Sequence, residues 1–249
     1  KRQVFKKENI GIQIKSKDLA KLFIYRDKAI QNGVIGKSLK KYFRGIMVYN
    51  KEEIPIKIRL KGDWVDHLSG DKWSFRIKIL GDKDFKGMKA FSIQHPKTRS
   101  FLKEWIMHKI FKDENILTTR YGFITASLNG NNLGIYAYEE HFSKELLQYN
   151  NKTEAPILKF NEEGIWQTRL NNPKNKNLYP FFEASDIIPF QKKSILSSNS
   201  LKKDFEKGFK LMTKYKEFNG NLEDIFDLNY TAKLYALYDI GKIRHSYHW

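Results

Sequence analysis

The chain of 249 residues contains no cysteine, which excludes disulfides, thiolate zinc sites and cysteine nucleophiles together. It also has no apolar run near the roughly 18 residues that a membrane-spanning helix needs. The first residues, KRQVFKKENI, lack both an initiator Met and the apolar core of a signal peptide. We therefore expect further residues upstream of Lys1. We leave the compartment open, including membrane-anchored or extracytoplasmic locations set by such a segment.

The composition predicts a packed globular protein with an anionic partner. Hydrophobic residues make up 41% of the chain and aromatic residues 14%, while the formal net charge is +18. However, the lysines are spread along the whole chain, and LKKDFEKGFKLMTKYKEF mixes both signs as solvated helices do. Nucleic-acid binding is the least favoured option, because the aromatic residues follow core periodicity and do not interleave with cations on one exposed face.

Residues 54–80 contain two strand-like runs joined by a connection rich in Gly and Asp. Apolar residues alternate with basic ones in both IPIKIRLK and WSFRIKIL, so one face of each strand is cationic. If the two runs pair, five cations share one side of a sheet, namely Lys57, Arg59, Lys61, Arg76 and Lys78. Solvent is the ordinary environment for such a face, so the rest of the chain must decide what it contacts.

The remaining pattern combines helices with a β-hairpin. A helix is predicted after Ser16, ending at Asn32-Gly33, and RGIMVYN reads as another strand. A second helix is predicted over TRSFLKEWIMHKIFKDENI, followed by two strands about a tight turn at Asn129-Gly130. The region after residue 200 returns to helical periodicity. We expect an N-terminal helical extension (1–45), a small lobe (46–142) and the incomplete start of a helical large lobe (143–249).

This order of elements is that of a protein-kinase small lobe leading into a helical large lobe. In that architecture a strand Lys pairs with a helix Glu and orients the nucleotide phosphates. The glycine-rich G-x-G-x-x-G motif and the V-A-I-K and H-R-D motifs are absent, which argues against an ordinary protein kinase. Order alone is weak evidence, because many α+β folds share it.

Several stretches together resemble the CotH kinase family, atypical kinases named after a spore coat protein of bacteria. The matching pieces are RLKGDW, KWSFRIKI, SFLKEWIMHKI, LNGNNLGIYAYEEHF, ILKF and LYALYDIGKIRHSYHW. The most specific piece is the Asn-Gly turn followed by Gly-x-Tyr and an acidic residue. The resemblance implies an α+β, atypical protein-kinase-like fold. Its small lobe would be an antiparallel sheet with one helix, and its large lobe mainly helical and truncated here.

The resemblance also implies ATP with Mg²⁺ as cofactors and phosphate transfer to protein Ser or Thr. On this sequence the phosphate-binding residues would be Lys78 first, then Arg76 and Lys72. Glu104 would be the helix partner, and Glu140 matches the acidic position after Gly-x-Tyr. Ordinary alternatives stay open for these side chains: a solvated strand lysine, a helix-surface acid and a surface ion pair. No metal ligand is predicted within the chain.

The resemblance also implies a position for the catalytic base. Family members place an acidic base, an Asn and a metal-holding Asp after the helix that LYALYDI would form, and no Asp, Glu or Asn occurs after Ile240. Asp239 and His245 are the candidates, the latter because imidazole titrates near neutral pH. We expect the chain as given to be inactive or slow, a degenerate member. The alternative is a non-catalytic basic scaffold for an acidic coat, envelope or polysaccharide partner.

Overall fold

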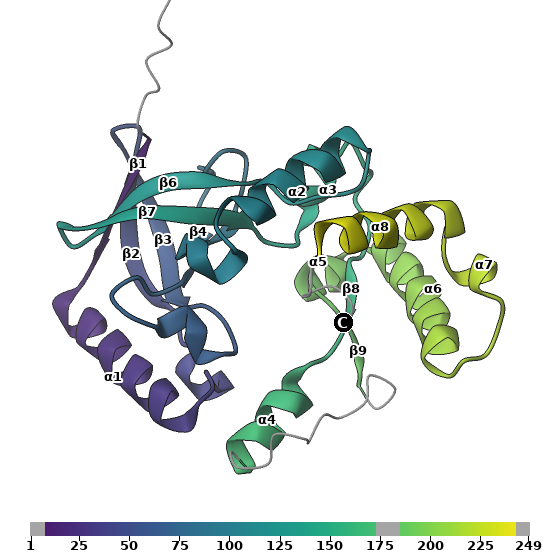
Figure 1. Ribbon diagram of the computed structural model, residues 1–249, viewed down its shortest axis with the longest axis horizontal. Coiled ribbons are helices and arrows are strands. Elements are labelled where there is room, and N and C mark those ends of the chain that lie inside the picture. Colours follow the sequence, from purple (N-terminus) through teal and green to yellow (C-terminus); the bar gives the residue numbers. More distant parts are fainter. Residues whose placement is uncertain (1–7, 173–184, 243–249) are drawn as a thin grey trace, which may run out of the picture. The chain divides into compact units, whose positions relative to one another are not determined.

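The computed structural model describes residues 8–172 and 185–242 (Figure 1). These residues divide into two compact units, and the division falls within a helix, between Trp105 and Ile106. The first unit contains the residues up to Trp105 together with Thr119–His141 and a short stretch from Leu170. The second contains Ile106–Thr118, Phe142–Arg169 and the described residues from 185 onward.

The first unit is built on a closed barrel with the strand order β1-β2-β3-β4-β5-β7-β6. Its strands are β1 (Asn9–Ile14), β2 (Phe43–Tyr49), β3 (Glu52–Leu60), β4 (Phe75–Ile79), β5 (Ala90–Gln94), β6 (Tyr121–Leu128) and β7 (Asn131–Glu140). Neighbouring strands pair antiparallel except β1 and β6, which are parallel and close the barrel. Closure gives every strand two partners and leaves no open sheet edge.

The predicted antiparallel-sheet small lobe of a kinase-like fold is therefore wrong, although the α+β class is confirmed. The reason is β1, where the sequence analysis assigned no strand. NIGIQI alternates exposed or half-buried residues with Ile10, Ile12 and Ile14, and it pairs with β2 on one side and β6 on the other. This short segment converts an open sheet into a mixed barrel.

Strict alternation fills the barrel interior and explains its register. The buried inward side chains are Ile10, Ile12, Ile14, Met47, Ile54, Ile56, Ile58, Leu60, Phe75, Ile77, Phe91, Ile93, Ile124, Ala126 and Tyr136. Leu22 and Ala29 of α1 (Ser16–Asn32) belong to the same buried cluster, so this helix packs on the barrel. A slip of one residue would turn all the inward side chains of a strand outward, so the apolar pattern fixes the pairing.

Two predicted turns are confirmed. α1 ends at Gly33, whose φ of 73° is the left-handed conformation typical of a helix C-terminus. Asn129 and Gly130, with φ values of 48° and 86°, form the two-residue connection between β6 and β7 (Figure 1). The Asn129 side chain also bonds both Ile14 N and Ile14 O, at 2.8 and 2.9 Å, and so ties the hairpin to the end of β1.

The second unit is mainly helical, with one small two-stranded sheet. Its elements are most of α2 (Leu102–Asp113), then α3 (Lys144–Tyr149), β8 (Leu158–Phe160), most of α4 (Glu163–Asn171), β9 (Ile187–Pro189), α5 (Lys192–Ser197), α6 (Asn199–Lys216), α7 (Leu222–Ile225) and α8 (Leu228–Gly241). β8 and β9 pair antiparallel. Met107, Phe111 and Ile116 form a buried cluster against which residues of α8 pack. Within the described residues, no helix is long and apolar enough to span a membrane.

Candidate functional site

The two basic runs of the sequence pair as predicted and share the outer face of the barrel. β3 and β4 are antiparallel, with Lys57 opposite Lys78 and Arg59 opposite Arg76. Their apolar neighbours point inward, so these side chains point outward. We call the five basic residues the cationic face: Lys57, Arg59, Lys61, Arg76 and Lys78. The face continues across β5 and β7, because Arg76 is opposite Ser92, which is opposite Glu139.

A buried ion pair lies at one edge of the cationic face. The Lys61 ammonium donates to Glu139 Oε2 at 2.5 Å and to Gln94 Oε1 at 2.6 Å. The Gln94 amide in turn donates to Glu139 Oε2 at 3.1 Å, which closes a triangle of hydrogen bonds. Lys61 is only 7% exposed. Three strands or strand ends therefore fix one cation and one anion in place.

The ionisation of this pair follows from its surroundings. Burial lowers the pKa of Lys61 to about 8; nearby Arg99 and Arg76 lower it, and the carboxylate of Glu139 opposes the change. Burial raises the pKa of Glu139, but Lys61, Arg99 and Arg76 outweigh burial and bring that pKa well below its ordinary value. Both groups are therefore charged at neutral pH.

Arg76 and Ser92 carry buried polar atoms without a hydrogen-bond partner among the described residues. These atoms are Arg76 Nε, Arg76 Nη1 and Ser92 Oγ, and the two residues are directly opposite each other on β4 and β5. Burial lowers the pKa of Arg76. Unpaired buried donors of a charged group are unfavourable by about 1–3 kcal/mol or more. An anionic acceptor at this position would relieve that penalty.

The local electrostatic field is positive, as the neighbouring histidines indicate. Burial lowers the pKa of His141, and Arg76, Lys78 and Arg59 lower it further. Burial likewise lowers the pKa of His67 to about 4, with Lys61 as the next contribution. Burial first, and then the surplus of nearby cations, keeps these two imidazoles neutral. Such a site is suited to a phosphate-bearing ligand.

The structure places the predicted phosphate-binding residues unevenly. Arg76 is central to the cationic face. Lys78 is exposed on the same face, and its ammonium lies 5.2 Å from the centre of the Tyr42 ring. Lys72 is in the connection before β4, where its ammonium donates to the Ile135 carbonyl at 3.3 Å. Lys72 therefore makes its contact at β7 and does not belong to the row of basic strand residues.

The two predicted acidic partners take different positions from the expected ones. Glu104 is in the first turn of α2. Burial is the main cause that raises the pKa of Tyr121, and the charge of Glu104 is the second. Glu140 is buried and pairs with Arg120, which donates through its backbone N at 3.0 Å and its Nε at 2.9 Å. Because side chains alternate along β7, Glu139 and not Glu140 points to the cationic face.

Of the two predicted catalytic residues, Asp239 and His245, the structure describes Asp239. Asp239 is exposed and still within α8, as expected from the sequence. His245 lies outside the described residues. Among the described residues, no group of three or more His, Asp or Glu side chains gathers as a metal site would require. We therefore assign no Mg²⁺ ligands.

The prediction from the sequence did not include Glu139, Gln94 or Arg99, and it placed Lys61 on the cationic face without naming it as a site residue. Alternation in IYAYEE was the available signal, since it puts the first Glu on the face opposite the buried Tyr136 and the partly buried Tyr138. No local signal pointed to Gln94 or Arg99, because their relation to Lys61 depends on pairing between strands distant in sequence.

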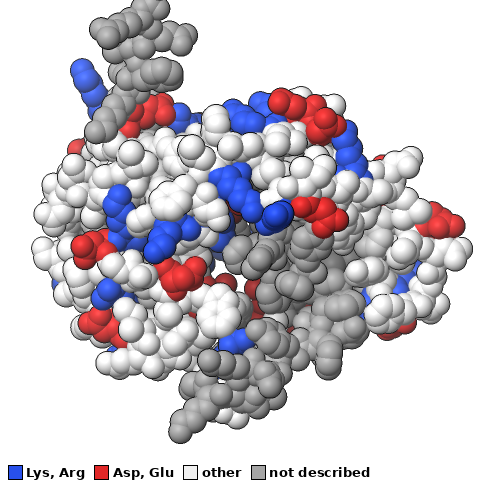
Figure 2. All heavy atoms as spheres, viewed as in Figure 1, with Lys and Arg blue, Asp and Glu red and all other residues white. Residues whose placement is uncertain are grey.

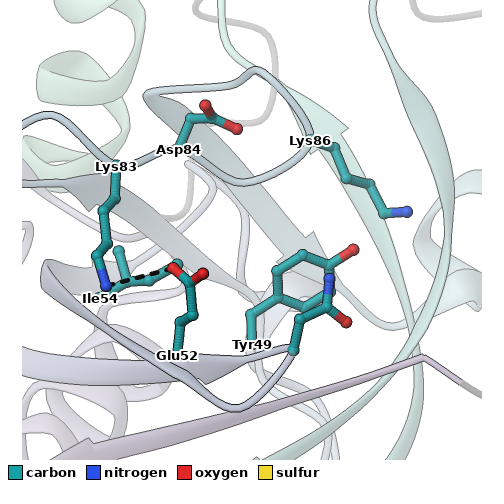
Figure 3. A pocket seen from close by; sticks show the side chains of 7 residues that line it. Tyr49, Glu52, Ile54, Lys83, Asp84 and Lys86 are labelled. Carbon is teal, nitrogen blue, oxygen red and sulfur yellow. Dashed lines mark ion pairs between the residues drawn. The ribbon is translucent and has the colours of Figure 1, made fainter.

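A separate pocket of about 290 Å³ lies near the β2–β3 turn (Figure 3). Its lining mixes both charges: the Lys83 ammonium is 3.3 Å from the carboxylate of Glu52, and Asp84 and Lys86 face the same opening (Figure 3). Lys86 also pairs with Glu8 at 2.8 Å. With its charges largely balanced, this pocket has less attraction for an anion than the cationic face.

Comparison with known proteins supports one assignment. No curated protein sequence gives a significant match to the chain. The family described as CotH kinase protein matches residues 58–238, which is most of the chain and includes β4 to β7 and the residues around Lys61 and Glu139. The chain therefore belongs to the CotH kinase family.

Proposed function

We propose that the cationic face binds the phosphate groups of ATP and that the chain takes part in ATP-dependent phosphate transfer to protein Ser or Thr. Family membership supports kinase-like chemistry. The observation that carries the proposal concerns two buried guanidinium nitrogens of Arg76, which have no hydrogen-bond partner among residues 8–172 and 185–242. They belong to the same cationic face as the ionised Lys61–Glu139 pair. Phosphoryl transfer depends on positioning and charge neutralisation, which this arrangement of fixed cations would supply.

The residues would divide the work by position. Arg76 and Lys61 would bind phosphate oxygens. The positive charge of Arg99, which lowers the pKa of both Lys61 and Glu139, would add to the attraction for an anion. Glu139 would hold the Lys61 ammonium in place, and Lys78 would extend the cationic surface. Mg²⁺, when bound with ATP, neutralises charge on the phosphates. Asp239 stays a candidate base.

Ligand-dependent stabilisation tests the nucleotide proposal. Wild-type protein at about 100 times Kd of Mg-ATP should gain roughly 2.7 kcal/mol in unfolding free energy. Arg76→Gln should weaken binding by roughly 10- to 150-fold, because a charge-assisted hydrogen bond contributes about 1.5–3 kcal/mol. Lys83→Gln, which alters the exposed pair with Glu52, is the matched control and should bind like wild type.

Failure of wild-type protein to respond to millimolar Mg-ATP would reject the proposal, as would equal affinity in Arg76→Gln. Transfer is a separate measurement, made with labelled γ-phosphate and a Ser/Thr-containing protein acceptor. Comparison of wild type with Asp239→Asn then tests whether that exposed carboxylate serves as the base. A variant that transfers phosphate at the wild-type rate would remove Asp239 from the mechanism.

A second candidate is a non-catalytic basic module that binds an acidic partner. The observation in its favour is a cross-strand row on β2, β3 and β4, in which Arg44 is opposite Lys57 and Lys57 is opposite Lys78. Basic and acidic side chains are otherwise interspersed on the visible surface (Figure 2). Binding of this kind should fall steeply with salt and need no Mg²⁺. Loss of partner binding in Lys78→Ala alone would argue against a diffuse surface.

A further inference from the structure

The connection between β3 and β4, residues 62–73, begins directly after Lys61 and returns beside it. Lys61 N donates to Ser74 O at 2.9 Å, and Ser74 N donates to His67 O at 2.8 Å. His67 Nδ1 lies 3.0 Å from Ser74 Oγ, in a pair that is buried. We call residues 62–73 the Lys61 loop. Its conformation determines the backbone position of Lys61.

Arg26 of α1 holds the distal half of the Lys61 loop. Its Nε donates to Leu68 O at 3.2 Å and its Nη2 to Gly70 O at 3.4 Å. The guanidinium also lies 4.9 Å from the centre of the Trp73 ring, which Phe23 contacts edge-on. The planar guanidinium combines directional donors with ring stacking, and neither Lys nor Gln reproduces both.

The segment after α1 holds the proximal half of the loop. The Lys40 ammonium pairs with the carboxylate of Asp63, two residues beyond Lys61. Ile35 N donates to Asp63 O at 2.7 Å, and Val34 forms a β-bridge with Trp64. The loop is thus attached at both ends to residues that precede the barrel strand β2.

We infer that Arg26 and Lys40 are positioning residues for the phosphate site, acting through the Lys61 loop. The inference rests on the proposed function. These residues lie outside the family match, which begins at residue 58. Their contacts hold backbone carbonyls and a carboxylate of a loop that is rich in Gly and Asp and partly exposed. Without them the loop would sample more conformations, and the Lys61 ammonium would lose its fixed approach to Glu139.

The experiment compares Arg26→Met/Lys40→Met with wild type by hydrogen exchange and by calorimetry with Mg-ATP. We expect faster amide exchange within residues 61–74 and a 10- to 100-fold higher Kd in the double variant. Lys40→Arg in a chain that retains Arg26 keeps the charge next to Asp63, and it should bind with nearly wild-type affinity. Lys28→Met, an exposed position on α1, controls for charge removal, and it should leave both measurements unchanged.

Lys86→Met is the control for a loss of stability alone, because it removes an ion pair with Glu8 that does not involve the Lys61 loop. That variant should lower the melting temperature but leave the Kd within twofold of wild type. Unchanged exchange in residues 61–74, or wild-type affinity in the double variant, would overturn the inference. A wild-type protein that binds no Mg-ATP would instead reject the proposed function. The exchange data would then still decide whether Arg26 and Lys40 order the loop.

Discussion

Lys61→Met separates the stability and binding roles of the buried ion pair. The substitution keeps an unbranched side chain of similar length but removes the ammonium that bridges Glu139 and Gln94. Removing one partner of a buried pair leaves the other charge uncompensated, which typically lowers the free energy of unfolding by about 3–5 kcal/mol. Relief of the burial penalty that lowers the Lys61 pKa offsets part of this loss. For a chain of this size we expect a decrease of roughly 10 °C in Tm.

The pH dependence makes the prediction specific to this lysine. The pKa of Lys61 is lowered to about 8 in the folded protein, and its ordinary value is 10.5. Between these two pH values the unfolded chain binds the proton and the folded chain does not. The wild-type unfolding free energy therefore gains about 1.4 kcal/mol per pH unit from this group across the window. Lys61→Met lacks that contribution, so the unfolding free energy of wild type minus that of the variant should increase from pH 8 upward.

Anion binding should show the opposite trend, because the charged ammonium is the form that attracts phosphate. Urea titrations and tripolyphosphate calorimetry at several pH values between 6.5 and 9.5 measure both quantities. Wild-type affinity should fall above pH 8, and the affinity of Lys61→Met should depend less on pH. Lys83→Met serves as the exposed-pair control. A stability difference that stays constant across this range would refute a lowered pKa for Lys61.

Two further substitutions test the local geometry by urea unfolding. Gly62→Ala should lower the free energy of unfolding by about 1–3 kcal/mol, because Gly62 has a φ of 103° and an added Cβ would lie 2.3 Å from His67 Cδ2. Gly33→Ala, at a positive φ but with open space around it, should lower it less. Equal losses in the two variants would contradict the contact with His67. Asn129→Ala should lose about 2 kcal/mol, because it removes both bonds to Ile14. Asn129→Asp keeps the acceptor for Ile14 N but sets a carboxylate oxygen against Ile14 O, so it should lose stability too, and wild-type stability in Asn129→Ala would contradict a role for these bonds.

Local patterns predicted much of the fold. Alternation in residues 54–80 gave the pairing of β3 with β4 and the shared cationic face, and Asn129-Gly130 gave the β6–β7 hairpin. These signals lie within the segments themselves. The barrel could not be predicted in the same way, since closure depends on β1 pairing with β6 more than a hundred residues later.

The candidate site was predicted less completely than the fold, for a related reason. Arg76 and Lys78 could be placed together on the outer face because their own strand alternates, and their role in binding stays a prediction. Gln94 and Glu139 come from β5 and β7, and their contact with Lys61 exists only after non-local pairing. The family pattern directed attention to Glu140, whereas the pleat of β7 determines which acidic residue faces outward. A motif identifies a position, but the register determines the direction of its side chain.

The adjacent acids of β7 provide the decisive comparison, because Gln substitutions at both sites preserve shape and remove one charge. Glu140→Gln weakens the buried pair with Arg120 and should destabilise the protein by about 3–5 kcal/mol, with tripolyphosphate affinity within twofold of wild type. Glu139→Gln also lowers stability, but it removes the carboxylate that is bonded to Lys61 on the cationic face.

A pH of 6.5 is below the pKa of Lys61, which is about 8, so the Lys61 side chain is charged in wild type. Loss of the neighbouring carboxylate removes repulsion of an incoming anion, an effect of about 3 kcal/mol for charges some 6 Å apart at an effective dielectric constant of 20. Imperfect placement of Lys61 offsets part of this gain, and so does a further lowering of the Lys61 pKa, which Glu139 raises in wild type. We therefore expect tripolyphosphate to bind up to about tenfold more tightly to Glu139→Gln. Calorimetry on both variants at this pH measures the difference. Equal affinities in the two variants would show that the cationic face is not where the anion binds.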